Sequence, residues 1–293
     1  MKKLNGFLRL TRPANIVTAI SDILAGAAIA GYAGGAPELF SVLLLIVATI
    51  GLYGGGVVFN DVFDADLDRI ERPERPIPSG LITEKEGAFL GISLLVVGIA
   101  AAFALSPYPS GSIAFTIAVA ALLYDKWGKH HNFFGPLNMG LCRGLNLLLG
   151  MTLVPEVLSR LGYLAVIPIL YIAAITMISR GEVHGGKSKT ILLAAFLYLV
   201  VIGSIFYVSA TNGNSLYASF FVVLLAILIY PPLIRAFREP VGKNIGKAVK
   251  AGVLALIVMN ASWAAAFGAL YLALAIVLLL PVSIFLARLF AVT

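Results

Sequence analysis

A run of acidic side chains follows the second apolar segment of the chain. It reads Asn60-Asp61-Val62-Phe63-Asp64-Ala65-Asp66-Leu67-Asp68, with four aspartates within eight positions. If a helix continues past Phe59, then Asn60, Asp64 and Asp68 stand at i, i+4 and i+8, with Asp61 beside them on one face. Like charges stacked in this way repel one another, so the cluster needs a cation, and hard oxygen ligands suit Mg²⁺. We predict a magnesium site; a solvated acidic loop paired with nearby arginines is the alternative.

Basic side chains suited to phosphate lie close to this run. Arg72 and Arg75 stand on the proline-rich turn Arg72-Pro73-Glu74-Arg75-Pro76, and a guanidinium group binds phosphate oxygens in a bidentate way. A later loop adds Tyr124, Lys126 and Lys129, for which an interfacial anchor is the competing interpretation. Carboxylates that recruit a divalent ion beside such cations can bind a diphosphate and stabilise its charge as it leaves.

Polar and charged residues also fall inside apolar segments. Asp22 lies in the first segment and Arg143 in the fifth, where each is costly unless it faces a partner, water or the protein interior. We therefore expect Asp22 and Arg143 to line a chamber and to pair; a buried structural ion pair is the alternative. Three asparagines are predicted to line the same chamber: Asn15, Asn138 and Asn146. Cys142, the single cysteine, excludes a disulfide framework and a cysteine-built metal site.

The composition indicates that these residues are carried by membrane helices. Of the 293 residues 60% are hydrophobic and 12% charged, and the mean hydropathy is +0.99. Apolar stretches suited to crossing about 30 Å of hydrocarbon recur along the chain. The candidates are Asn15–Gly34, Leu39–Phe59, Gly87–Leu105, Gly111–Leu123, Phe133–Val154, Leu161–Ser179, Thr190–Ala210, Ser215–Ile234, Ala251–Ala266 and Gly268–Ala287. The fourth needs Pro107–Ser110 to span, and the last two form either one broken pass or a tight hairpin, which gives nine or ten crossings.

The distribution of lysine and arginine predicts the orientation. Loops 1–14, 61–86, 124–132, 180–189 and 235–250 hold 18 of the 21 basic residues. Short cytoplasmic loops retain Lys and Arg, so we predict a cytoplasmic N-terminus and cytoplasmic motif loops in a bacterial-type inner membrane. Met1–Pro13 runs into the first span without the features of a cleavable signal. The net charge of +7 is thus a topology signal, and no soluble basic domain suggests a nucleic-acid partner.

The acidic run and the basic turn together resemble the first signature of the UbiA superfamily of intramembrane prenyltransferases. That signature reads roughly N-D-x-x-D-x-x-x-D followed by R-P-x-x-x-G, and it falls on Asn60, Asp64, Asp68 and the turn of Arg72 and Arg75. The resemblance extends to Arg12-Pro13-Ala14-Asn15 and to the loop of Tyr124 and Lys126. It implies one all-α domain, residues 1–293, with about nine helices around a lateral chamber, where Mg²⁺ holds a polyprenyl diphosphate and an acceptor captures the allylic cation.

The second acidic motif departs from the family pattern. Aligned on Gly186, the segment 178–190 places Ile178 and Glu182 where the family has two aspartates, and Arg180 lies between them. This divergence, with the segment Asn15–Ala30 and Arg143, most resembles the EboC-type branch. Glu182 is the predicted remaining metal ligand of this motif, with a loop residue paired to Arg180 or Lys187 as its alternative.

Three functions follow from these patterns. The first is Mg²⁺-dependent transfer of a prenyl group from a polyprenyl diphosphate to an unidentified acceptor in the bilayer. In it Asp64, Asp68 and Arg143 are the predicted catalytic residues, Asn60, Asp61, Asp64, Asp68 and Glu182 the metal ligands, and Arg72, Arg75, Tyr124, Lys126 and Lys129 the diphosphate ligands. The second is a non-enzymatic carrier of an isoprenoid, suggested by the incomplete second motif. The third is a secondary transporter coupled through Asp22 and Arg143.

Overall fold

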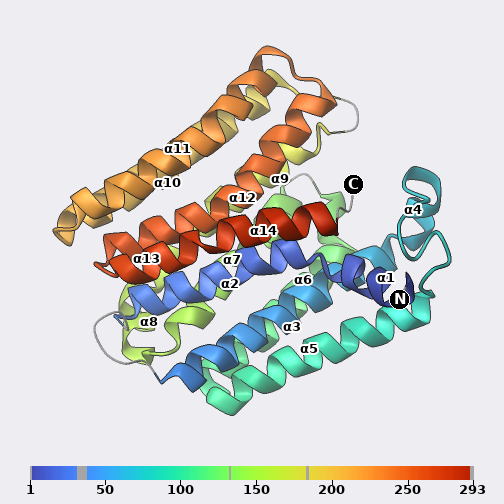
Figure 1. Cartoon of the computed structure of the whole chain (residues 1–293), viewed down its shortest axis with the longest axis horizontal. Coiled ribbons are helices and arrows are strands. Elements are labelled where there is room, and N and C mark those ends of the chain that lie inside the picture. The colour runs from blue at the N-terminus through green and yellow to red at the C-terminus, as the bar shows by residue number, and fades with distance from the viewer. Residues whose placement is uncertain (1, 32–37, 132, 183–184, 291–293) are drawn as a thin grey trace.

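A computed structural model describes residues 2–31, 38–131, 133–182 and 185–290, and every regular element in these ranges is helical. Figure 1 shows a bundle of long, roughly aligned helices with small helices at its two ends. The α-helices are α1 Lys2–Thr11, α2 Pro13–Ile29, α3 Leu39–Phe63, α4 Ala65–Glu71, α5 Glu84–Leu105, α6 Ser112–Lys126, α7 Phe134–Met151, α8 Pro155–Leu161, α9 Val166–Ser179, α10 Ser188–Thr211, α11 Ser215–Arg238, α12 Gly242–Ala266, α13 Leu270–Val277 and α14 Leu279–Leu289.

Among the described residues eight helical stretches are long and apolar enough to cross a membrane. Two further predicted spans correspond to the 17-residue α2 and the 18-residue α7. The fourth predicted span does borrow from the segment before it, because a short π-helix at Pro107–Gly111 joins α6 to make one 20-residue stretch. The predicted all-α, polytopic fold is confirmed.

The last two predicted spans form a hairpin rather than one broken pass. α12 is a complete 25-residue helix, and the chain then reverses at Gly268, whose φ of +80° favours glycine. α13 and α14 return along α2, and Ser283 Oγ of α14 donates to the carbonyl oxygen of Ala14, 2.9 Å away at the start of α2. The described end of α14 therefore lies at the same end of the bundle as α1 (Figure 1), as ten crossings require.

Glycines let the helices of the N-terminal half approach closely. A Cβ on Gly26 of α2 would lie 2.4 Å from the carbonyl oxygen of Leu147, and one on Gly150 of α7 would lie 2.5 Å from that of Ile23. Gly51 and Gly98 make a similar contact between α3 and α5. Small residues at helix contacts are the usual means of association in a bilayer, where lipid is as apolar as the side chains.

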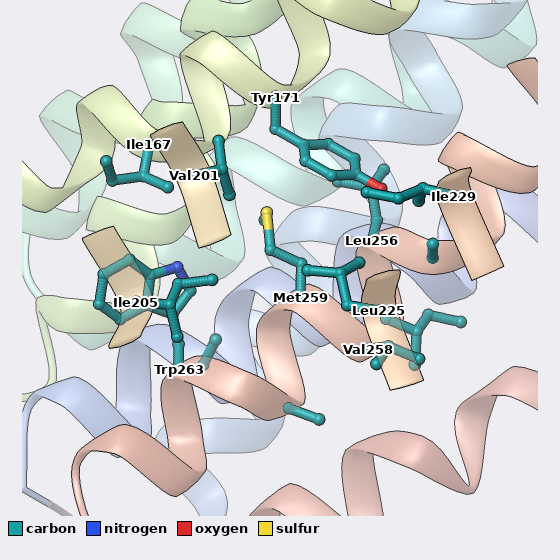
Figure 2. Close-up of a cluster of buried hydrophobic side chains, with 14 of the residues drawn as sticks. Ile167, Tyr171, Val201, Ile205, Leu225, Ile229, Leu256, Val258, Met259 and Trp263 are labelled. Carbon is teal, nitrogen blue, oxygen red and sulfur yellow. The ribbon is translucent and has the colours of Figure 1, made fainter. Parts of the chain in front are cut away.

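Large apolar side chains fill the C-terminal half. Figure 2 shows part of this core, with Trp263, Met259 and Leu256 of α12 packed among residues of α9, α10 and α11 such as Tyr171 and Val201. Trp263 and Tyr171 are fully buried, and the Tyr171 hydroxyl donates to the carbonyl oxygen of Gly252 at 2.9 Å. This packed core runs along the whole C-terminal half, from Ala266 at one end to Ile178 and Ile245 at the other. The acidic and basic motifs lie at the end of the bundle near α1 and α4 (Figure 1).

Candidate active site

A cavity of about 460 Å³ opens among α2, α3, α6, α7, α9 and α12. Its wall is mostly apolar, and polar residues gather at the end next to α1 and α4. We call this end the mouth; it comprises Arg12, Asn15, Asn60, Arg72, Asp125 and Ser179. The predicted chamber thus exists in the described part of the chain, with Asn15 and Asn146 on its wall. Asn138 lies beside Gly128 instead and is not among the wall residues.

One group of motif residues faces the mouth. α3 continues past Phe59 to Phe63, as the sequence predicts, which places Asn60 on its last turn. The Asn60 side-chain amide donates to Asp125 Oδ1 at 2.9 Å, and Asp64 accepts a hydrogen bond from the ammonium group of Lys129. Sequence reasoning missed Asp125, although it stands between Tyr124 and Lys126 in a loop already singled out. Asp125 is the only carboxylate of that loop, so the local sequence gives no sign of a metal site. Its partner Asn60 is brought to it only by the packing of α6 against α3.

A second group lies behind the first and is buried. Arg75 Nη1 lies 2.6 Å from Asp68 Oδ2 and 3.3 Å from Asp61 Oδ1, and Arg12 Nη2 lies 2.5 Å from Asp61 Oδ1. Positions 61 and 68 are seven residues apart, two helical turns, so they share a face more closely than 60 and 68 do. The helix also breaks at Asp64, between α3 and α4. The expectation that Asn60, Asp64 and Asp68 form one row is therefore wrong: Asp68 joins Asp61 and Arg75.

The predicted diphosphate ligands divide in the same way. Arg72 and Tyr124 line the cavity, whereas Arg75 is only 8% exposed and occupied by the two aspartates. Lys129 pairs with Asp64 beside the mouth, and neither residue is among the wall residues. The Lys126 ammonium lies 5.0 Å from the centre of the Trp127 ring and is not among the wall residues.

The second motif contributes one carboxylate and one hydroxyl. Glu182 is half-buried near Arg72; its burial raises the pKa of its carboxyl group, and the positive charge of Arg72 opposes that rise. Ile178 is only 3% exposed and belongs to the hydrophobic core, whereas Ser179 lines the cavity. Arg180 Nη2 donates to the carbonyl oxygen of His131 at 2.5 Å, so it ties the end of α9 to the loop after α6.

The predicted pairing of Asp22 with Arg143 is confirmed. Arg143 Nη1 donates to Asp22 Oδ2 at 2.8 Å, and its Nη2 donates to Thr18 Oγ1 at 2.6 Å. The guanidinium group also lies over the ring of Tyr53, 4.9 Å from its centre. Arg143 lines the cavity, and Asp22 balances its charge from behind. The prediction that Asp22 also lines the chamber is wrong, because Asp22 is buried and is not among the wall residues.

The donor atoms at the mouth, and that of Asp64 beside it, are of the kind that bind Mg²⁺. Asn60, Asp64 and Asp125 supply amide and carboxylate oxygens, which Mg²⁺ prefers, and the mouth leaves room for water. Behind them the buried Asp61 Oδ2 has no hydrogen-bond partner. Within the described ranges no group of three His, Cys, Asp or Glu residues is already gathered as a metal site. The carboxylates are instead held by Arg12, Arg75 and Lys129.

Fold and site together define a multi-pass membrane protein with arginine, asparagine and aspartate side chains at the mouth of a mostly apolar cavity. The sequence matches the model of the UbiA prenyltransferase family over residues 22–181, more than half of the chain. The chain belongs to this family.

Individual relatives agree with this assignment. The chain is 31% identical over 184 residues to a digeranylgeranylglyceryl phosphate synthase from Ignicoccus hospitalis, a match that covers 62% of this chain and 59% of the relative, less than two thirds of its length. A UbiA homologue from Aeropyrum pernix K1 has the same fold with a TM-score of 0.70 at 18% identity, covering 84% of this chain and 96% of that one. A UbiA homologue from Archaeoglobus fulgidus, solved with GPP and Mg²⁺, matches with a TM-score of 0.54 at 14% identity, and the match covers 91% of this chain and 99% of that one.

Proposed function

We propose that this protein transfers a prenyl group, in a Mg²⁺-dependent reaction, from a polyprenyl diphosphate to an acceptor within the membrane. The observation that carries the proposal is the mouth: Arg12, Arg72, Asn60 and Asp125 meet at one end of a cavity whose wall is otherwise mostly apolar. Cations and oxygen ligands side by side suit a diphosphate with its metal, and an apolar cavity suits the hydrocarbon tail.

The residues of the mouth would stabilise the leaving diphosphate. Breaking the bond between the allylic carbon and oxygen leaves the electron pair on the diphosphate, and Arg72 and Arg12 are placed to balance that charge. The allylic cation stays in the apolar cavity, from which water is excluded. The acceptor then forms the new bond to this carbon and releases a proton to a carboxylate of the mouth or to the diphosphate.

Asn60, Asp64 and Asp125 would hold Mg²⁺, and Glu182, beside Arg72, would supply a further carboxylate. When bound, the ion neutralises diphosphate oxygens. Lys129 would have to release Asp64 for this, and its ammonium group would then be available to the phosphate. Asp61, Asp68 and Arg75 fit a supporting role, in which Arg75 holds α4 and the following turn against α3.

A carrier function is the second candidate. It is favoured by the internal pairing of Asp61, Asp64 and Asp68 with cations and by the single carboxylate of the second motif. In that case the cavity would hold an isoprenoid without bond cleavage.

The acceptor stays open. The Ignicoccus relative is named for digeranylgeranylglyceryl phosphate, which makes a glycerophosphate-type acceptor a natural first compound to test. The EboC-type branch and the bacterial-type inner membrane stay predictions; the relatives compared above come from archaea.

The test is to incubate purified protein with labelled prenyl diphosphates and Mg²⁺, with and without lipid extracts. Release of diphosphate that needs Mg²⁺ and increases with an extract supports the transferase. Tight binding of the diphosphate with no release under any condition supports the carrier. Absence of binding refutes both.

A further inference from the structure

The inner end of the cavity is closed by a floor that contains one buried hydrogen bond between polar side chains. We define the floor as the wall residue that lies farthest from the mouth on each of α3, α6, α7, α9 and α12: Thr49, Ile117, Asn146, Ile172 and Leu256. Thr49 Oγ1 donates to Asn146 Oδ1 at 2.8 Å, and this bond joins α3 to α7 across the floor.

A buried network supports this bond from below. Asn146 Nδ2 donates to Asp22 Oδ2 at 3.0 Å and to the carbonyl oxygen of Ala19 at 2.9 Å. Asn260 Nδ2, one turn beyond Leu256 on α12, donates to Asp22 Oδ1 at 2.7 Å. The bond of the floor is thus tied to α2, α3, α7 and α12 at once, and moving Thr49 or Asn146 would leave a buried polar group without its partner.

The space beneath the floor is already filled. α2 and α7 meet there backbone to backbone at Gly26 and Gly150, and the core around Trp263 occupies the C-terminal side (Figure 2). A long ligand therefore cannot extend past the floor by rotating one side chain.

The depth of the cavity follows from helix geometry. From Asn60 to Thr49 is eleven residues of α3, roughly 16 Å at about 1.5 Å per residue, and from Ser179 to Ile172 on α9 is seven residues, roughly 10 Å. An extended chain advances about 1.2 Å per bond, as three backbone bonds span about 3.5 Å, so an isoprene unit of four chain bonds spans roughly 5 Å. The cavity takes two or three isoprene units.

We propose that the hydrogen-bonded floor limits the donor of this protein to geranyl or farnesyl diphosphate and disfavours geranylgeranyl diphosphate. The inference rests on the proposed prenyl-diphosphate site and adds its substrate class. A fourth isoprene unit would have to fold back or break the buried bond between Thr49 and Asn146.

The test measures binding without an acceptor, so that it does not depend on turnover. The affinities of geranyl, farnesyl and geranylgeranyl diphosphates are measured by calorimetry in detergent with Mg²⁺, below the concentrations at which the ligands form micelles. The wild type should bind geranylgeranyl diphosphate about tenfold or more weakly than farnesyl diphosphate, since accommodating it costs a buried hydrogen bond.

Substitutions in the floor should change the longest prenyl tail that binds. Thr49→Leu and Ile117→Phe place larger side chains at the inner end of the cavity. They should lower the affinity for farnesyl diphosphate about tenfold and leave the affinity for geranyl diphosphate unchanged. Thr49→Ser keeps the hydroxyl and should retain the wild-type preference. Val119→Phe, on the exposed side of α6, is the matched control and should change none of the three affinities.

Two results would overturn the length limit while leaving the proposed function intact. One is equal affinity of the wild type for farnesyl and geranylgeranyl diphosphates, which would mean that the tail leaves sideways into the bilayer. The other is an unchanged farnesyl affinity in folded Thr49→Leu and Ile117→Phe proteins. If no prenyl diphosphate binds, the length limit and the proposed function fail together.

Discussion

Asp22 should stabilise the fold mainly by balancing the charge of Arg143 inside the membrane. Its carboxylate accepts hydrogen bonds from Arg143 at 2.8 Å, from Asn146 at 3.0 Å and from Asn260 at 2.7 Å, and the residue is 1% exposed. Replacing Asp22 with Leu leaves the guanidinium group buried without its counter-charge. Removing one member of a buried ion pair costs about 3–5 kcal/mol, and insertion measurements for a lone Arg in a helix centre give a similar figure of about 3 kcal/mol. We expect Asp22→Leu to lower the free energy of unfolding by about 3 kcal/mol.

A double-mutant cycle separates this charge effect from lost packing. The unfolding free energies of wild type, Asp22→Leu, Arg143→Met and the double variant are measured by SDS titration in mixed micelles. The double variant should be more stable than the sum of the single effects predicts, by about 2 kcal/mol, because neither charge is then left alone. Ser283→Ala is the control, since it removes one hydrogen bond and no charge, and should cost under about 1 kcal/mol. Additive effects, or an Asp22→Leu variant as stable as wild type, would refute the reasoning.

Three further predictions concern the mouth and the topology. Asp64→Asn should weaken Mg²⁺-dependent binding of a prenyl diphosphate at least about tenfold, whereas Asp66→Asn, whose side chain is 95% exposed, should not; equal losses would contradict the proposed ligand set. Burial raises the pKa of Glu182 above its ordinary 4.5, so the folded state holds the proton of this carboxyl group more tightly than the unfolded state does. As the pH rises above 4.5, the wild type should therefore lose stability relative to Glu182→Gln. Parallel plots of unfolding free energy against pH for the two proteins would disprove this. Reporters fused after Ser79 and at the C-terminus should both read cytoplasmic, and opposite sides would exclude ten crossings.

The sequence alone was sufficient for the membrane helices, because each span needs its own run of apolar residues. It also sufficed for the pairing of Asp22 with Arg143, because a charge inside the hydrocarbon needs a partner and few charged partners other than the opposite residue are available there. The same reasoning did not find Asn260, which is uncharged and lies 238 positions from Asp22. Contacts of this kind depend on how α12 packs against α2, and no local pattern records that packing.

The grouping of the aspartates shows where periodicity stops being reliable. The four-residue spacing holds from Asn60 to Asp64, which caps the end of α3 and donates its backbone N–H to the carbonyl oxygen of Asn60, but the helix ends at Phe63 and a new one begins at Ala65. Asp68 then pairs through Arg75, which comes from a proline-rich turn whose path the sequence does not define. The residue types of the site were predictable, and their partners were not.

The second motif allows a last prediction, in which the choice of position decides the outcome. Alignment on Gly186 suggests Ile178→Asp as the way to restore the missing family carboxylate, but Ile178 lies in the core and is 3% exposed. An aspartate there would be buried without a partner and should destabilise the protein by several kcal/mol. Ser179 is the neighbouring residue that lines the cavity, and its carbonyl oxygen accepts a hydrogen bond from the backbone N–H of Glu182 at 3.0 Å.

Ser179→Asp should therefore raise the affinity for Mg²⁺ and speed the release of diphosphate, while Ile178→Asp should lower the yield of folded protein and improve neither. Magnesium binding by calorimetry and diphosphate release at saturating Mg²⁺ measure the two effects, and Ser179→Asn is the uncharged control. If Ile178→Asp folds normally and gains activity while Ser179→Asp does not, the end of α9 must turn by about a quarter of a helical turn or more when substrate binds. The wall of the cavity described above would then be wrong at this helix.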